Sequence, residues 1–259
     1  MRRRDFVASS AASGLVAQAE ENQTNQYIEV RFFHVRNSYA QQPKRLVKFL
    51  EEHHLPMTKR NELGPVGYFA VTMGAEWPMF SMVLTYDSLS DMETKNRRKF
   101  GDRKWMNAAD EFGSAKEPPF ARMESSLLKA FDGMPRLVPP SHPISTKSSK
   151  VFDLRIYQAE TFRDVREKVK MFNEGEISLF KKVGINPVFF GQAIIGSKLP
   201  NLTYMVWYKD MTARQMAWKK FSDSDEWKKM SSKPEWANEE IVSNISKIQM
   251  EALSFSEIR

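Results

Sequence analysis

The chain has 259 residues, 41% hydrophobic and 12% aromatic, so it is long enough for two domains of ordinary size with substantial cores. Its 39 Lys and Arg against 32 Asp and Glu give a formal net charge of +7, but the two signs are mixed along the chain and no nucleic-acid-binding motif accompanies them, so no nucleic-acid partner is expected. The absence of cysteine excludes disulfides, thiolate metal sites, a cysteine nucleophile and a lipid-modified cysteine.

The first 19 residues have the pattern of an export signal. Arginines at 2–4 precede Phe6 and a weakly apolar segment, and Ala17-Gln18-Ala19 has the small-x-small pattern of a signal-peptidase site. Consecutive arginines with mild hydrophobicity are typical of twin-arginine signals. We therefore expect a signal peptide at 1–19 that is cleaved after Ala19, and a periplasmic or extracellular mature chain. A mitochondrial presequence is the alternative, against which Asp5 and the cleavage site count.

Residues 27–132 predict the order strand, helix, strand, strand, helix, strand. Period-2 alternation and β-rich runs indicate the strands, and an apolar stripe with Pro43 in the first turn indicates the first helix. The expected strands are 27–33, 66–73, 80–86 and 120–131, and the expected helices are 43–54 and 87–100, the second continuing near Trp105. No apolar run in the mature chain approaches the roughly 20 residues that cross a membrane, so no membrane span is expected.

Residues 133–150 are rich in Pro, Ser, Thr and Lys, which predicts a linker. The same order of elements then returns, so residues 151–258 form a second domain. Its expected strands are 151–157, 187–195, 202–208 and 245–255, and its expected helices are 161–182, interrupted at Gly175, and 212–221, with a continuation at Trp227.

Individual residues also repeat, which indicates duplication. One separation of 122 positions (187 − 65, 200 − 78, 208 − 86) relates Pro65-Val66 to Pro187-Val188, Pro78 to Pro200 and Tyr86 to Tyr208. After a slip of one residue Lys99-Phe100 matches Lys220-Phe221, and Glu29-x-Arg31-x-Phe33 matches Asp153-x-Arg155-x-Tyr157. The first copy lacks Asn173-Glu174-Gly175-Glu176, so a specialisation of the second copy is expected at that helix end.

Each unit has the ferredoxin-like βαββαβ order, so the fold class is α+β: two tandem domains, each with two helices on a four-stranded antiparallel sheet. Pressing the two sheets together within one chain encloses an intramolecular barrel of the dimeric α+β type. Alternation along the first strand of each unit predicts one set of side chains that packs against the helices: Val30, Phe32, Leu154 and Ile156. The opposite face, with Glu29, Arg31, Phe33, Asp153, Arg155 and Tyr157, would then give the barrel a mixed polar and aromatic interior.

Four motifs together resemble the NIPSNAP family: Met171-Phe172-Asn173-x-Gly175-Glu176, Asn186-Pro187-Val188-Phe189-Phe190-Gly191, Pro200-Asn201-Leu202-Thr203-Tyr204-Met205 and Ser125-Ser126-Leu127-Leu128-x-x-Phe131. The resemblance covers residues 27–258. It implies a tandem pair of dimeric α+β barrel domains, bacterial by its export signal. It implies no particular reaction, because the family is not defined by an established catalytic activity and its animal members are associated with mitochondria and partner proteins.

Arg31 and Arg155 are the best-placed polar pair for a ligand. Two guanidinium groups in an enclosed lumen could hold a carboxylate or another anion through charge-assisted hydrogen bonds. The alternative is that each arginine pairs within its own sheet, Arg31 with Glu29 and Arg155 with Asp153.

Two further groups are candidates for ligand contact. Tyr86, Tyr204 and Tyr208, with Tyr157, would line the lumen or its rim, unless they are core aromatics. Asn173, Glu174 and Glu176 place two carboxylates and an amide at a helix interruption, where they could divide acid and base roles or simply satisfy freed backbone groups.

The sequence contains no motif for a metal, phosphate, dinucleotide or serine nucleophile, so no catalytic residue, metal site or cofactor is assigned. His34, His53, His54 and His142 lack metal-ligand spacing; a haem ligand among them stays an alternative. The basic run from Lys95 to Lys104 is interpreted as a solvated helix face, with an anionic surface as the alternative.

The expected function is therefore binding of a small organic molecule or a partner protein. The alternative is a cofactor-independent enzyme, monooxygenase-like or isomerase-like, that acts on a small organic substrate in the lumen. A homo-oligomer formed through exposed sheet edges is also possible.

Overall fold

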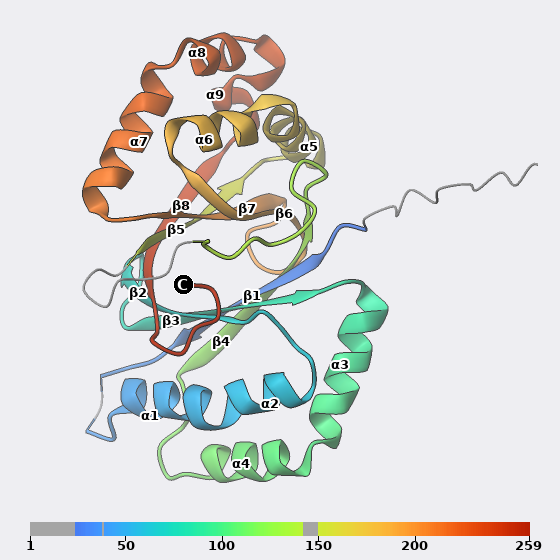
Figure 1. The fold of residues 1–259 in the computed structure, drawn as a ribbon, viewed down its shortest axis with the longest axis vertical. Coiled ribbons are helices and arrows are strands. Elements are labelled where there is room, and N and C mark those ends of the chain that lie inside the picture. The colour runs from blue at the N-terminus through green and yellow to red at the C-terminus, as the bar shows by residue number, and fades with distance from the viewer. Residues whose placement is uncertain (1–23, 38, 142–149) are drawn as a thin grey trace, which may run out of the picture.

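In the computed structural model, which describes residues 24–37, 39–141 and 150–259, two βαββαβ units follow one another (Figure 1). The predicted fold class is therefore confirmed. The strands of the first unit are β1 (Tyr27–His34), β2 (Gly67–Met73), β3 (Met79–Tyr86) and β4 (Arg122–Ala130). Those of the second are β5 (Val151–Gln158), β6 (Asn186–Ile195), β7 (Asn201–Tyr208) and β8 (Asn244–Ala252).

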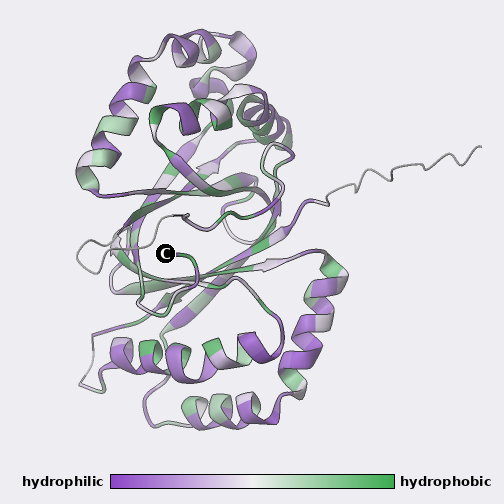
Figure 2. Ribbon diagram, in the orientation of Figure 1, coloured by the Kyte–Doolittle hydropathy of each residue, from purple (hydrophilic) through white to green (hydrophobic). Residues whose placement is uncertain are grey.

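The helices lie on the outside of the two units, at opposite ends of the long axis, with the barrel between them (Figure 1). The first unit has α1 (Gln42–Phe49), the π-helical turn η1 (Leu50–His54), α2 (Leu55–Arg60), α3 (Leu89–Gly101) and α4 (Arg103–Gly113). The second has α5 (Phe162–Met171), the π-helical turn η2 (Phe172–Glu176), α6 (Ile177–Val183), α7 (Met211–Asp223), α8 (Asp225–Ser231), the 3₁₀ turn η3 (Pro234–Trp236) and α9 (Asn238–Ile241). Hydrophilic and hydrophobic residues alternate along these helices, as expected for elements with one face on a sheet (Figure 2). Within the described ranges, no helix is both long and apolar enough to cross a membrane.

The eight strands close into one antiparallel barrel in the order β1-β3-β2-β8-β5-β7-β6-β4. Each unit contributes a four-stranded sheet, and the pairs β2–β8 and β4–β6 join the two sheets. Every strand of the described chain thus has a neighbour on both sides. Closure leaves no complete edge strand, so the expected association through exposed sheet edges is limited to strand ends such as residues 122–126 of β4, which pair with β1 alone.

The sheet face that was predicted to pack against the helices lines the barrel lumen instead, and the face predicted for the lumen lies under the helices. Val30 and Leu154 belong to one core cluster with residues of both units, and Phe32 and Ile156 pack against it, so all four line the barrel lumen. Residues of the other parity pack under the helices of their own unit, as Phe33 and Tyr157 do. Both faces of each sheet are covered, one by helices and one by the opposite sheet, so alternation separates the faces without telling which is which.

The separation of 122 positions continues through the helices. Helices α3 and α7 begin and end at matching positions (211 − 89 and 223 − 101), and the turns η1 and η2 match as well (172 − 50). The predicted one-residue slip is therefore wrong: Lys99 corresponds to Phe221. The helix irregularity at Asn173–Glu176 is also shared, although its residues differ between the copies.

The two ends of the barrel differ. At the end where β1 begins, the C-terminal segment crosses the opening: Ile258 is fully buried in the lumen cluster, and Glu257 N donates to Val66 O at 3.0 Å. Leu137, which follows β4, joins the same cluster. The opposite end of the lumen has no such cover in the described chain, and a cavity opens there.

Candidate functional site

Arg31 lies under the helices of the first unit and is held by Glu29. Its Nε and Nη2 donate to the two oxygens of that carboxylate at 2.5 and 2.9 Å. Ser125 Oγ and Tyr86 Oη donate to the same carboxylate at 2.7 and 3.0 Å. Burial acts to raise the pKa of Glu29, but the charge of Arg31 and these hydrogen bonds outweigh it and hold the pKa below its ordinary value. The salt-bridge alternative is thus the arrangement found for Arg31.

A cavity of about 280 Å³ adjoins this network between the sheet and the helices of the first unit. Strands β1 and β3, helix α1 with η1, and helices α3 and α4 contribute to its walls. Its lining is mostly aromatic and aliphatic, and includes Phe33, Phe49, Leu50, Trp105, Phe112 and Phe120. Three basic side chains, Arg31, His54 and Lys99, complete it. We call this space the helix–sheet cavity.

Lys99 is the cation of the cavity without an acidic partner. Its Nζ donates to Asn96 Oδ1 at 3.0 Å and lies 4.6 Å from the centre of the Phe100 ring, and it forms no ion pair with any residue that the structure describes. Burial, followed by the charge of Arg31, lowers the pKa of Lys99. The ammonium group is therefore partly removed from water, and the negative charge of Glu29, the partner of Arg31, only partly offsets this shift.

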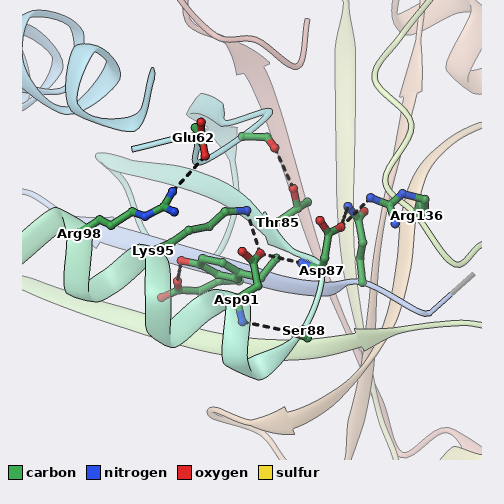
Figure 3. A network of polar contacts seen from close by, with 12 residues as sticks. Glu62, Thr85, Asp87, Ser88, Asp91, Lys95, Arg98 and Arg136 are labelled. Carbon is green, nitrogen blue, oxygen red and sulfur yellow. Dashed lines mark hydrogen bonds and ion pairs between the residues drawn. The ribbon is translucent and has the colours of Figure 1, made fainter. Parts of the chain in front are cut away.

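Helix α3, which carries Lys99, is fixed at its start by a polar network (Figure 3). Ser88 Oγ caps the helix by accepting from Asp91 N at 3.0 Å, and Lys95 pairs with Asp91 at 2.8 Å. Asp87, just before the cap, accepts from Arg136 at 2.6 Å. These contacts stabilise the start of α3, and near Lys99 the helix is joined to the turn that follows α2 by the pair of Arg98 with Glu62 at 3.0 Å.

His54 lies at the end of η1 and is buried against the cavity. Its Nδ1 is 2.8 Å from Tyr68 Oη. Burial, then the charges of Arg31 and Lys99, lower its pKa to about 3. The imidazole is therefore neutral at neutral pH, so the positive charges of the cavity are those of Arg31 and Lys99.

In the second unit the equivalent space is filled by aromatic rings. The second unit has Phe172 at the position of Leu50 and Phe221 at the position of Lys99, and both rings are buried. Phe180 packs against Phe221 with ring centres 5.2 Å apart. At the position of Met82 the second unit has Tyr204, whose hydroxyl donates to the Tyr157 hydroxyl at 3.0 Å. Tyr157, Tyr204 and Tyr208 belong to this core cluster and do not line the lumen as expected, because their strand faces are covered by helices.

Arg155 is packed and only loosely paired. Asp153 lies 3.7 Å away and is engaged instead by Arg214, whose Nε is 2.8 and 2.9 Å from its two oxygens. The guanidinium of Arg155 lies 3.7 Å from the centre of the Trp218 ring, and its buried Nε has no hydrogen-bond partner among the described residues. Arg31 and Arg155 thus occupy separate units, and the barrel does not bring them together.

Asn173, Glu174 and Glu176 do not converge on one point. Asn173 Oδ1 accepts from Gly133 N at 3.0 Å, and exposed Glu174 is 3.9 Å from Lys170. Glu176 is buried and accepts from Lys168 Nζ at 3.0 Å; burial raises its pKa against the opposing charge of Lys168. This geometry matches the structural alternative for the helix interruption. The tyrosines, arginines and acids named from the sequence therefore lie outside the lumen and do not serve the lumen-enzyme alternative; Glu76 and Glu124, which line the open end of the lumen, were not among them.

The family is decided by the sequence match to both repeats. Residues 28–133 and 152–257 each match NIPSNAP. The chain belongs to the NIPSNAP family. The predicted resemblance and its tandem organisation are confirmed. No curated protein matches the chain.

Solved structures with a similar fold support the barrel architecture of this NIPSNAP chain. Two are named as candidate monooxygenases. One, from Fusobacterium nucleatum, has 8% identity over 89% of this chain and 93% of its own, with a TM-score of 0.57. The other, from Lactobacillus acidophilus, has 8% identity over 88% and 94%, with a TM-score of 0.58. An anthrone oxidase-like protein has 11% identity over 89% and 92%, with a TM-score of 0.50. At these identities the likeness shows the fold alone.

Proposed function

We propose that this protein binds a small organic acid in the helix–sheet cavity of its first repeat. The observation that carries the proposal is the contrast between the repeats: where the second repeat has Phe172 and Phe221, the first has Leu50 and Lys99 around a space of about 280 Å³. Lys99 is half-buried at the position of a buried phenylalanine, and taking a charge partly out of water costs stability unless a partner compensates it. A bound anion is such a partner.

The lining suggests how such an acid would lie. Its carboxylate would accept from Lys99 Nζ, and charge-assisted bonds of this kind are stronger than neutral ones. Its hydrocarbon part would pack on aromatic rings such as Trp105 and Phe112. The cavity is at the small end of the usual range of about 300–1,000 Å³, which favours a single ring or a short chain.

Calorimetric titration with 4-ethylbenzoate tests the proposal. The unmodified protein should bind it, and Lys99→Met should weaken binding about 10- to 100-fold, since a hydrogen bond to a charged group is lost. The double change Leu50→Phe and Lys99→Phe gives the first repeat the residues of the second and should abolish binding while the protein stays folded.

Lys220→Met, an exposed lysine on α7, is the matched control and should leave the affinity unchanged. Binding that survives the double change would refute the assignment of the cavity. A folded protein that shows no binding to 4-ethylbenzoate or to short fatty acids would refute the proposed ligand class. Binding of a partner protein and formation of a homo-oligomer stay predictions.

We also propose that the protein is exported and cleaved after Ala19. The basic start and the Ala17-Gln18-Ala19 pattern support this proposal; both lie outside the described residues. N-terminal sequencing of the periplasmic fraction of a bacterial host with twin-arginine export should find Glu20 first. An intact Met1 in that fraction would contradict cleavage.

A further inference from the structure

A second cavity, of about 430 Å³, lies at the open end of the barrel lumen. Both repeats line it: the ends of β1 and β5, the starts of β4, β7 and β8, and the turns β2–β3 and β6–β7. It is separate from the helix–sheet cavity, because the alternation of strand residues places the two spaces on opposite faces of the first sheet.

The lining of this cavity is partly apolar and partly polar. Phe32, Ile156 and Ile248 give it apolar side chains. Ser126 and Thr203, which lie opposite Val30 and Ile156 on the neighbouring strands, give it hydroxyl groups. Ser81, opposite Phe32 on the lumen face of β3, has a buried Oγ with no hydrogen-bond partner among the described residues. Such a mixed lining suits a molecule with one apolar end and one polar end.

Four side chains form a charge network at the opening. Arg122 Nη2 donates to Glu76 at 2.7 and 2.9 Å, and its Nε donates to Glu124 Oε1 at 2.9 Å. His34 Nδ1 is 2.9 Å from Glu76 Oε2, and its Nε2 is 3.4 Å from Glu124 Oε1 without the alignment of a hydrogen bond. Lys198 Nζ, across the cavity, donates to Ser246 Oγ at 2.8 Å.

The network leaves a hydrogen-bond acceptor free at the cavity. Glu124 Oε2 accepts from no residue that the structure describes, while Oε1 of the same carboxylate is held by Arg122. The charge of Glu124 is already partly compensated, so the group does not require a cation. A hydroxyl group, which donates one hydrogen bond without carrying charge, matches this acceptor.

We infer that the open end of the lumen is a second ligand site, for an uncharged hydroxyl compound such as a phenol, whose hydroxyl donates to Glu124 and whose ring lies on Phe32, Ile156 and Ile248. The site does not depend on the organic-acid site of the first repeat. The two sites differ in ligand charge, one for an anion beside Lys99 and one for a neutral donor beside Glu124, so one pair of probes separates them.

Methionine-methyl NMR distinguishes the two cavities directly. Met79 lines the lumen cavity, whereas Met82 and Met123 line the helix–sheet cavity, and each signal is assigned by a Met→Leu change. Titration with 4-ethylphenol should shift Met79 with saturation at a Kd of about 1 mM or below, and leave Met82 and Met123 unmoved. The carboxylate analogue 4-ethylbenzoate should leave Met79 unmoved.

Two variants complete the test on the full chain. Ile156→Trp fills the cavity and should abolish the Met79 shift. Glu124→Gln changes a partly exposed side chain and should weaken 4-ethylphenol binding about tenfold, through loss of a charge-assisted bond. Glu174→Gln, an exposed carboxylate in the second repeat, is the control and should have no effect.

The inference is overturned if Met79 does not respond to 4-ethylphenol, or if folded Ile156→Trp binds it as well as the unmodified protein. Should Ile156→Trp fail to fold, Glu124→Gln decides: an unchanged affinity overturns the assignment of the hydroxyl to Glu124. A shift of Met82 and Met123 with phenol would place neutral ligands in the helix–sheet cavity and would likewise contradict the inference. None of these outcomes bears on 4-ethylbenzoate binding.

Discussion

At the scale of single residues, His54 shows how a change of one side chain alters the same position in two repeats. It corresponds to Glu176, and both are buried polar groups at the end of a π-helical turn. Glu176 has a cation, Lys168, as its partner, whereas His54 has the neutral Tyr68 hydroxyl and two nearby cations that oppose its protonation. The neutral imidazole lets the first repeat concentrate its positive charge on Arg31 and Lys99.

His54 should make folding stability depend on pH. Its pKa is about 3 in the folded state against 6.5 in the unfolded chain, so the unfolded state binds the proton first as the pH falls. Stability should therefore be complete above pH 6.5 and decline as the pH falls towards 3, by up to about 1.4 kcal/mol per pH unit. Between pH 7 and 5, urea unfolding should show a loss of about 2 kcal/mol that His54→Gln removes.

His53→Gln, a change at the neighbouring histidine, controls for the general effect of losing an imidazole. If His54→Gln keeps the full pH dependence of the unmodified protein, the buried neutral histidine is not its source.

At the scale of elements, the π-helical turns η1 and η2 occur at the same position in both repeats, although their side chains differ. In the second repeat, Lys168 of α5 and Glu176 of η2 form an ion pair with both side chains 2% exposed. The matching positions in the first repeat carry Leu46 and His54. The interruption therefore does not need a particular residue, and the buried pair is one of two ways to fill the space beneath it.

Removing one member of the buried pair should lower stability strongly, whereas replacing both members by apolar residues should not. Lys168→Leu leaves the Glu176 carboxyl buried without its cation and should lower the free energy of unfolding by about 3–5 kcal/mol. The double change Lys168→Leu and Glu176→Leu should recover most of that loss, since well-packed apolar residues can replace a buried pair. Lys170→Leu, which affects only the exposed pair with Glu174, should cost less than about 0.5 kcal/mol. Equal losses for the single and double changes, in urea unfolding, would contradict this account.

At the scale of the whole molecule, the barrel is closed at one end and open at the other. The C-terminal segment covers the end where β1 begins, through Ile258 in the lumen and the pairing of Glu257 with Val66. The two hairpin turns frame the opposite end and leave the lumen cavity there. Among the described residues, the entrance to the lumen is therefore at the end that carries this cavity.

Ile258 should contribute to stability as a core residue does, although it is next to the last residue of the sequence given. Ile258→Ala removes a fully buried side chain and should lower the free energy of unfolding by about 2–5 kcal/mol, through lost burial and the space left behind. Ile245→Ala, at the open end with 37% of the residue exposed, should cost less than about 1 kcal/mol. Similar small losses for both, measured by urea unfolding, would show that the C-terminal segment does not close the barrel.

The repeat drew attention to some residues of the candidate site, although the lumen location predicted for them was wrong. Arg31 and Tyr86 were identified because the duplication marks them, and both belong to the network beside the helix–sheet cavity. Lys99 was missed because a one-residue slip aligned it with Lys220, another lysine, and hid its replacement by Phe221. The constant separation of 122 positions, applied through the helices, would have revealed that difference.

The sequence by itself determined the order of elements, the duplication, the family and the closed barrel, because these depend on local periodicity and on a pattern that occurs twice. Only the tertiary structure decided which face of each strand lies under the helices, since both faces are buried and alternation treats them alike. It also decided that one repeat encloses a cavity while the other is filled. That difference depends on the volumes of side chains such as Leu50 and Phe172, which meet partners distant in the chain, and no local pattern records how such volumes add up.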